Sequence, residues 1–344
     1  MELSPRKQAV LAAVTSAYIK TGEPIGSKAL TLLLKNAPSS ATLRSEMSEL
    51  CDLGLLTQPH TSAGRIPTSR GFKLYVDTLM RPDKISESDK AFIDAGLKNL
   101  HAAPEAIPRM AGELLSELTG LPAVTCFCTG SSPEIRRAEL IPVSRNSVLL
   151  LLITRDGRAR SRIFRTGLGY TPGLALKFSE LVEKRVKGRP VTELTKGYMQ
   201  SIIASAGSDS LDLSPFMSVL FETAASIEES DVSLSGETEL YNICESEAAA
   251  RRILSLVSLK EPILSIIDGI NGGLGVVFGS ETGFKELNSK TVIAAKYGGK
   301  DRLKGAVALI GPNRISYDRL IPVVEYTALR LSDIMTEAGQ DMEE

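Results

Sequence analysis

The stretch that decides the fold covers residues 39–54 and reads SSATLRSEMSELCDLG. A serine at its start can cap a helix, because the hydroxyl accepts a hydrogen bond from a free backbone N–H, and Gly54 is typical of a helix end. Apolar side chains recur at helical spacing at Leu43, Met47 and Leu50. The opposite side carries polar residues: Thr42, Arg44, Ser45, Ser48 and Glu49. The stretch therefore predicts a helix with one packed side and one exposed side.

The segments on either side complete a small module. Upstream, the Ser-Pro pair at residues 4–5 marks the start of a helix that we expect to end near Thr21, and a shorter helix is expected over residues 28–34. Downstream, residues 55–67 are expected to form a two-stranded hairpin, with Gly64 taking a positive φ at the turn. Three short helices followed by such a hairpin predict an N-terminal winged helix-turn-helix.

Charge is distributed unevenly along the chain. Residues 1–81 contain ten Lys or Arg against six Asp or Glu, which gives +4, whereas the whole chain carries −1. A basic module at one end suits a polyanion such as DNA. We expect Arg44 to contact bases or phosphates in the major groove and Arg65 to contact the phosphate backbone. The full set of candidate DNA-binding residues is Lys28, Ser39, Ser40, Thr42, Arg44, Ser45, His60, Thr61, Ser62 and Arg65. A solvated helix face and an ordinary hairpin turn are the alternatives for these residues.

Several runs of the chain match a known pattern. Near the N-terminus they are residues 21–28 (TGEPIGSK), 39–44 (SSATLR) and 58–68 (QPHTSAGRIPT), and near the C-terminus residues 279–281 (GSE), 292–297 (VIAAKY) and 311–317 (GPNRISY). With these runs the sequence closely resembles the HrcA family of bacterial heat-inducible repressors. It departs from the family pattern at Ser45, at the Ile-Ser pair of residues 315–316 and over residues 236–241.

The resemblance carries expectations about function and architecture. It implies a homodimer that binds double-stranded DNA at an inverted-repeat operator upstream of chaperone genes, with activity supported by the GroEL chaperonin. It also implies a GAF-like α+β domain that contains an inserted dimerisation domain. A dimer suits this function because two heads at fixed separation combine their binding energies on the two halves of a palindrome.

Periodicity along the rest of the chain gives a multidomain α+β protein. We expect strands over residues 123–129, 138–143, 147–154 and 159–166 as one antiparallel meander, and again over 263–268, 275–279, 291–297 and 305–311. A closing helix is expected over residues 317–335. The predicted domains are a DNA-binding domain (1–81), a helical connector (82–121), a GAF-like domain (122–167 and 231–344) and a helical inserted dimerisation domain (168–230).

Other classes of protein are disfavoured by the sequence. The apolar run at residues 147–154 is far shorter than the roughly 20 residues of a membrane span, and no signal peptide precedes the first helix, so we expect a cytoplasmic protein with no membrane partner. Four cysteines without Cys-x-x-Cys spacing and two histidines predict no metal site, and we expect no cofactor. The glycine-rich run at residues 269–275 precedes a strand rather than a helix, so we expect no phosphate loop and no enzyme. A regulator that binds a small molecule in its GAF-like domain remains the alternative.

Overall fold

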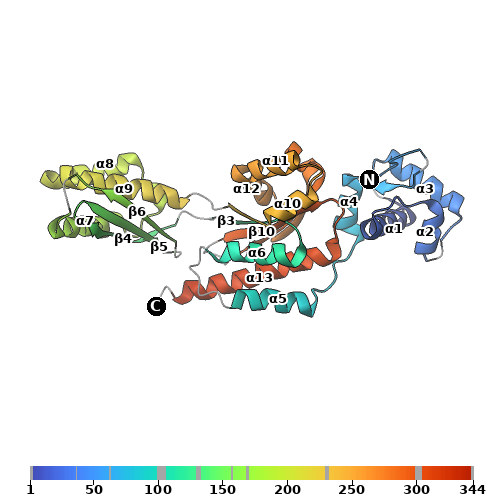
Figure 1. Ribbon diagram of the computed structural model, residues 1–344, viewed down its shortest axis with the longest axis horizontal. Coiled ribbons are helices and arrows are strands. Elements are labelled where there is room, and N and C mark those ends of the chain that lie inside the picture. Colours follow the sequence, from blue (N-terminus) through green and yellow to red (C-terminus); the bar gives the residue numbers. More distant parts are fainter. Residues whose placement is uncertain are drawn as a thin grey trace.

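The computed structural model describes residues 3–35, 37–61, 63–98, 106–128, 133–155, 158–167, 170–228, 232–298 and 304–341. Figure 1 shows three parts in a row, which we call the head (residues 3–79), the body (residues 80–128 and 232–341) and the insert (residues 133–228). The chain is a mixed α+β protein, as the sequence predicts. In the described residues, no helix is both long and apolar enough to cross a membrane.

The head contains the three short helices and the hairpin expected from the sequence. The helices are α1 (Pro5–Thr21), α2 (Ser27–Leu33) and α3 (Ser40–Asp52), and the hairpin pairs β1 (Leu56–Thr57) with β2 (Ile66–Pro67). A fourth helix, α4 (Ser69–Leu74), continues into a π-helical turn, η1 (Tyr75–Leu79). The head has its own apolar core, formed by side chains from all three leading helices: Val10, Leu11, Val14, Leu30, Leu43, Met47 and Leu50.

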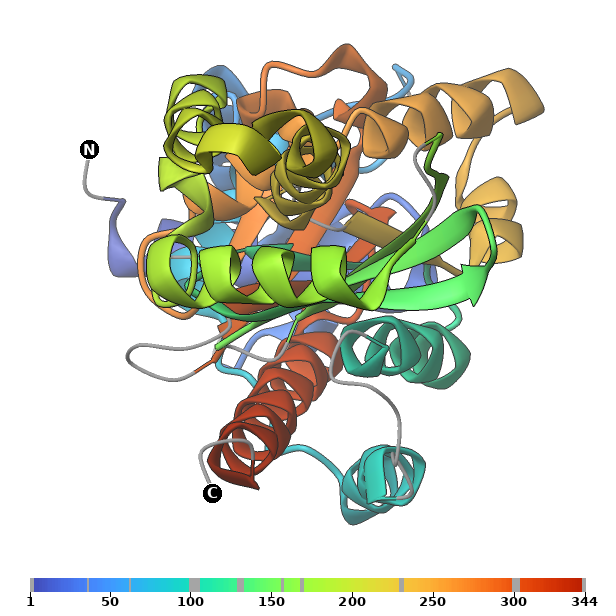
Figure 2. The same ribbon diagram turned by 90° about the vertical axis from the view of Figure 1, so that its left-hand side faces the viewer.

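The body is a five-stranded antiparallel sheet between two helical layers. Its strand order is β7-β3-β10-β9-β8, with β3 (Ala123–Cys128), β7 (Val232–Ser235), β8 (Leu274–Phe278), β9 (Lys290–Tyr297) and β10 (Lys304–Pro312). One face packs against α6 (Ile107–Thr119) and α13 (Tyr317–Asp341), with α5 (Glu87–Lys98) outside them, and the other against α10 (Glu237–Ile243), α11 (Glu247–Ser258) and α12 (Glu261–Asp268). Figure 2 shows these layers on opposite sides. Along β10 the side chains alternate between the two cores, as strand geometry requires.

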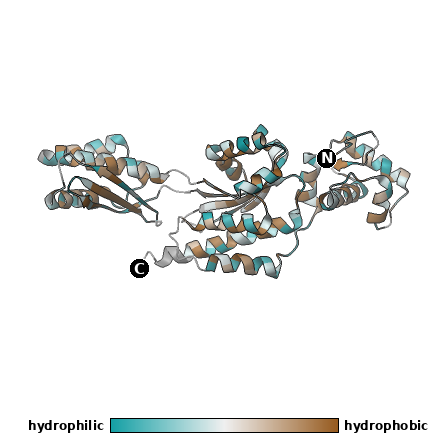
Figure 3. Ribbon diagram, viewed as in Figure 1, coloured by the Kyte–Doolittle hydropathy of each residue, from teal (hydrophilic) through white to brown (hydrophobic). Residues whose placement is uncertain are grey.

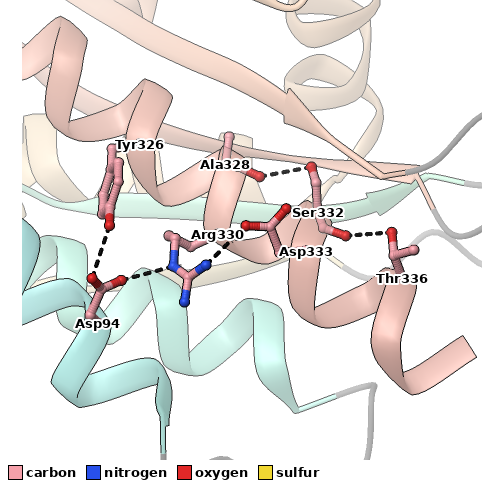
Figure 4. A network of polar contacts seen from close by, with 7 residues as sticks. All are labelled: Asp94, Tyr326, Ala328, Arg330, Ser332, Asp333 and Thr336. Atoms are coloured by element: carbon pink, nitrogen blue, oxygen red, sulfur yellow. Dashed lines mark hydrogen bonds and ion pairs between the residues drawn. The ribbon is translucent and has the colours of Figure 1, made fainter. Parts of the chain in front are cut away.

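Helix α5, the first helix after the head, is held on α13 by charged pairs. Asp94 accepts hydrogen bonds from the Tyr326 hydroxyl at 2.9 Å and from Arg330 Nε at 2.8 Å (Figure 4). Five residues earlier, Asp89 accepts two hydrogen bonds from the Arg319 guanidinium, at 3.1 and 3.3 Å. These hydrogen bonds tie the segment that leaves the head to the longest helix of the body.

The insert is a separate unit, which corrects the meander expected over residues 123–166. Strands β4 (Ile135–Ser144), β5 (Ser147–Thr154) and β6 (Ala159–Arg165) form a sheet of their own, whereas β3 pairs with β7 and β10. One face of the new sheet packs against α7 (Pro172–Arg185), α8 (Lys196–Ser205) and α9 (Ser210–Glu228) in a common core. Because the strands and the helices share this core, the inserted unit begins near residue 133 rather than at residue 168.

The expected strand over residues 263–268 is wrong, because this segment is α12. Pro262 lies in the first turn, where its missing N–H costs nothing. Ile263, Ile266 and Ile267 are all buried, and their spacing matches one face of a helix. The run is short and apolar, so its periodicity is compatible with both structures, and the proline is the signal that favours the helix.

Candidate nucleic-acid interface

Helix α3 has the two-sided character predicted from its sequence. Leu43 and Leu50 are completely buried and Met47 is 3% exposed, which fixes this helix on the head core. On the other side Arg44 and Ser45 are exposed, together with Ser48 and Glu49. The outward side chains are therefore presented on a rigid base, which is what recognition of a fixed partner surface requires.

Hydroxyl groups at the start of α3 have structural partners within the head. Ser39 Oγ accepts a hydrogen bond from the backbone N–H of Thr42 at 3.2 Å and lies 2.9 Å from the Thr42 hydroxyl. Ser40 Oγ lies 2.9 Å from Ser27 Oγ, which joins the first residues of α2 and α3. Lys28 is exposed and follows Ser27 directly. Three of the candidate hydroxyls thus shape the turn, and Lys28, Arg44 and Ser45 are the candidates directed outward from these helices.

Two ion pairs join α1 to α3, and the sequence analysis did not identify them. Arg6 Nε lies 2.8 Å from Glu46, whose side chain is 8% exposed, and Lys7 Nζ lies 2.6 Å from Glu49. The hydrogen bond to Glu49 raises the pKa of Lys7 above its usual value. No local pattern in the sequence indicates these pairs, because their partners lie on different helices and Arg6 and Glu46 are 40 positions apart. The pairs neutralise two carboxylates of α3, Glu46 and Glu49, and thereby reduce the negative charge beside Arg44 and Ser45.

The hairpin tip is closed by side-chain to backbone hydrogen bonds. Gln58 Nε2 donates to the carbonyl oxygens of Thr61 at 2.8 Å and Ala63 at 3.0 Å. His60 and Thr61 are exposed at this tip, as a phosphate-contacting role requires. The remaining candidate at the tip, Ser62, lies outside the described residues.

Arg65 and its glycine neighbour connect the hairpin to the loop before α2. The backbone N–H groups of Arg65 and Ile25 each donate to the other residue's carbonyl oxygen, at 2.9 and 3.0 Å. Gly64 does not have the positive φ expected of it. Instead, Gly64 allows the hairpin backbone to approach the backbone of Ile25 closely, since a Cβ atom at position 64 would lie 2.4 Å from the Ile25 carbonyl carbon. Arg65 itself is half-buried, and its Nε atom has no hydrogen-bond partner among the described residues.

Known proteins are similar to this chain over most of its length. A family model described as the HrcA protein C terminal domain matches residues 105–321. The heat-inducible transcription repressor HrcA of Chromobacterium violaceum is 29% identical over 97% of this chain and 99% of its own length, and that of Syntrophobacter fumaroxidans is 30% identical over 99% of each. A crystal structure of a hypothetical protein superposes with a TM-score of 0.65 at 27% identity, covering 98% of this chain and 99% of that one. The family model covers more than half of the chain and the relatives cover nearly all of it, so the chain belongs to the HrcA family of heat-inducible transcription repressors.

Proposed function

We propose that this protein represses chaperone genes by binding, as a homodimer, to an inverted-repeat DNA operator. In this proposal the head is a winged helix-turn-helix, α3 enters the major groove and the hairpin lies along the phosphate backbone. The observation that carries the proposal is the outward side of α3, where Arg44 and Ser45 are exposed on a helix whose other side is buried. An arginine at this place has the length and the donor pattern to read a guanine edge.

The hairpin supplies the contacts that hold the head on the duplex without reading its sequence. His60 and Thr61 are exposed at its tip, and the Nε group of Arg65 has no hydrogen-bond partner among the residues that the structure describes. Arg65 Nη1 donates a long hydrogen bond, of 3.5 Å, to the Ala63 carbonyl oxygen, and a phosphate oxygen would offer the guanidinium a stronger, charge-assisted acceptor. Such contacts fix orientation, whereas contacts from α3 supply specificity.

Dimerisation is assigned to the insert because one face of its sheet has an apolar centre, bordered by Arg137, Glu139 and Arg165, and no helix of the described residues packs against it. Val148, Leu150 and Leu152 of β5 face the helices and are buried, so the alternate residues face away. On that second face Ile141, Leu149 and Ile163 lie side by side across the three strands, and Ile141 and Ile163 are 39% and 62% exposed. In Figure 3 brown, hydrophobic segments are visible on the strands of the insert. An exposed apolar sheet face favours association with an identical face through a two-fold axis.

The body, in this proposal, is a GAF-like domain that links the heads to the dimer contact, and GroEL supports the active state. The placement of the head and the insert at opposite ends of the body supports this division of roles (Figure 1). Addition of GroEL to the purified protein is expected to increase operator occupancy. Excess unfolded protein, which binds GroEL, is expected to reverse this increase. If operator occupancy stays the same in both experiments, GroEL does not support the repressor.

The DNA-binding proposal is tested by mobility shift with a duplex taken from the upstream region of the chaperone genes. Arg44→Ala is expected to weaken binding by about 1 to 3 kcal/mol, or roughly tenfold to a hundredfold in Kd, and to relax preference for one base position. The matched control is Arg109→Ala in α6, which removes an arginine that is 69% exposed on the body. Equal effects of the two substitutions would show that α3 does not read the operator.

A small-molecule effector is the second candidate, and a hollow in the body favours it. The hollow has a volume of about 290 Å³, near the lower end of the range for ligand pockets, and lies between β7 and α11. Its polar lining residues are Ser233, Glu237, Ser258 and Lys260. Filling it with Ser258→Trp is expected to leave DNA binding and its response to GroEL unchanged. A variant that still binds DNA but no longer responds to cell extract would favour the effector instead.

A further inference from the structure

Two runs that the sequence analysis singled out near the C-terminus contact the head, far from them in sequence. They are the run Gly279–Glu281, which forms a short 3-10 turn after β8, and the run Gly311–Tyr317, which connects β10 to α13. Neither belongs to the candidate DNA-binding surface or to the apolar face of the insert. We call the contacts that they make with the head the joint.

Asn313 lies at the centre of the polar contacts of the joint. Its Nδ2 group donates to Ser69 Oγ, at the first residue of α4, over 3.1 Å. Its Oδ1 atom accepts a hydrogen bond from Thr291 Oγ1 at 2.9 Å, and its carbonyl oxygen accepts one from the Tyr317 hydroxyl at 2.7 Å. The body therefore holds Asn313 by its side-chain Oδ1 atom and by its backbone carbonyl oxygen, and the side-chain Nδ2 group donates to the head.

Arg314 reaches the C-terminal end of α1 in the head. Its Nη1 group donates to the carbonyl oxygen of Ile19 over 3.4 Å. The last carbonyl groups of a helix have no partner in the helix and carry partial negative charge, so a guanidinium there is favourable. Gly22, which ends the helix with φ +74°, has no Cβ, and a Cβ atom would lie 2.9 Å from Arg314 Nη1. The glycine at position 22 of the head thus leaves room for the Arg314 guanidinium of the body.

Aromatic rings and an ion pair complete the joint. Phe72 of α4 is 3% exposed, and its ring centroid lies 6.2 Å from that of Tyr18 in α1 and 6.4 Å from that of Tyr317 in the body. Beside it, Lys73 forms an ion pair with Glu281. Contacts with the body are made by both α1 and α4, so rotation of the head about either helix alone would break contacts at the other.

We propose that the joint sets the angle at which each head leaves the body, and thereby the spacing between half-sites that the dimer can bind. Asn313, Arg314 and Glu281 are positioning residues in this proposal, because they act through the head and do not touch DNA. The proposal rests on the DNA-binding function proposed above. It follows from geometry: a head attached by a flexible segment would tolerate many spacings, whereas a head held at several points matches few.

The test removes one contact at each end of the joint with Ser69→Ala combined with Arg314→Ala. Both substitutions shorten side chains without entering an apolar core. If the matched orientation is then populated about a tenth of the time, Kd for a duplex with two half-sites rises about tenfold. Binding to a duplex with a single half-site is expected to stay unchanged, and the preference for one spacing is expected to weaken. The matched control is Ser255→Ala combined with Arg251→Ala, on α11 of the body.

A second measurement follows the head without DNA. Distance distributions are measured between spin labels at Leu32 of the head and Leu329 of α13, which are 88% and 56% exposed, in protein diluted with unlabelled chains. The wild type and the control are expected to give one narrow distribution, and the joint variant a broad one. Lys73→Glu alone should broaden it, and Lys73→Glu combined with Glu281→Lys should restore it.

The outcomes separate the joint from the proposed function. If the joint variant has the same distance distribution and the same spacing preference as the wild type, the proposal that the joint sets the angle of the head is overturned. A wild type that binds no operator, while the joint variant still broadens the distances, overturns the DNA-binding function and leaves the joint as a structural device.

Discussion

Replacing Ile163 by aspartate tests the dimer contact that we assign to the insert. Ile163 is 62% exposed in the single chain and lies beside Leu149 on the open face of the sheet. Burying a whole isoleucine side chain contributes about 1.5 to 3 kcal/mol, so covering the exposed part contributes about 1 to 2 kcal/mol. A symmetric dimer contains the contact twice, which gives about 2 to 4 kcal/mol. The dimer Kd is therefore expected to rise roughly 30-fold to 1,000-fold, before the cost of burying the new carboxylates is added.

Sedimentation equilibrium over a range of protein concentrations measures this change directly. The matched control is Leu211→Asp, because Leu211 is 82% exposed and lies on α9, in the helical layer of the same insert. The Ile163 variant is expected to be monomeric at concentrations where the wild type and the Leu211 variant are dimers. If the Ile163 variant dimerises as tightly as the wild type, the open face of the sheet is not the contact. Equal dissociation of both variants would indicate a general effect of added charge.

Three further predictions concern stability. Tyr317→Phe removes a buried hydroxyl that donates a hydrogen bond to the Asn313 carbonyl oxygen. Thermal unfolding should therefore show a free energy of unfolding that is lower by about 1 to 3 kcal/mol. An unchanged melting temperature would contradict this hydrogen bond. The hydrogen bond from Arg319 lowers the pKa of Asp89, so this pair stabilises the fold above the ordinary aspartate value of about 4 and its contribution is lost as the pH falls further. Urea unfolding measured from pH 7 to pH 3 should therefore show that the free energy of unfolding falls less in Asp89→Asn than in the wild type. Equal decreases in the two proteins would refute this role of Asp89. Gly64→Ala should destabilise the head, because the added Cβ atom would collide with the Ile25 backbone. The variant is therefore expected to melt at a lower temperature than the wild type, and an equal melting temperature would contradict this role of Gly64.

The head was predictable because its signals are local. A serine hydroxyl caps the backbone three residues later, and apolar side chains recur at 43, 47 and 50 within a single helix. The exposure of Arg44 and Ser45 follows from that periodicity. The roles of Ser40 and Gly64 were not accessible in the same way, because each depends on a residue in another segment, Ser27 for the first and Ile25 for the second.

The body and the insert were harder because strand pairing is set by distant parts of the chain. Strand β3 looks the same in sequence whether it pairs with β4 or with β7 and β10. The alternation in β5 likewise shows one buried face without identifying the helices that cover it. In the sequence, the body side of the joint appears only as two runs that carry the family resemblance, and its contact with the head is not visible because Ser69 and Asn313 are 244 positions apart.

The measurement closest to the central claim is a hydroxyl-radical footprint of the full-length protein on the upstream region of the chaperone genes. Two heads held by one dimer are expected to protect two stretches of backbone that are related by a two-fold axis and separated by a whole number of helical turns, about 10 base pairs each. A single protected stretch without symmetry, or protection that spreads evenly along the duplex, would contradict the account.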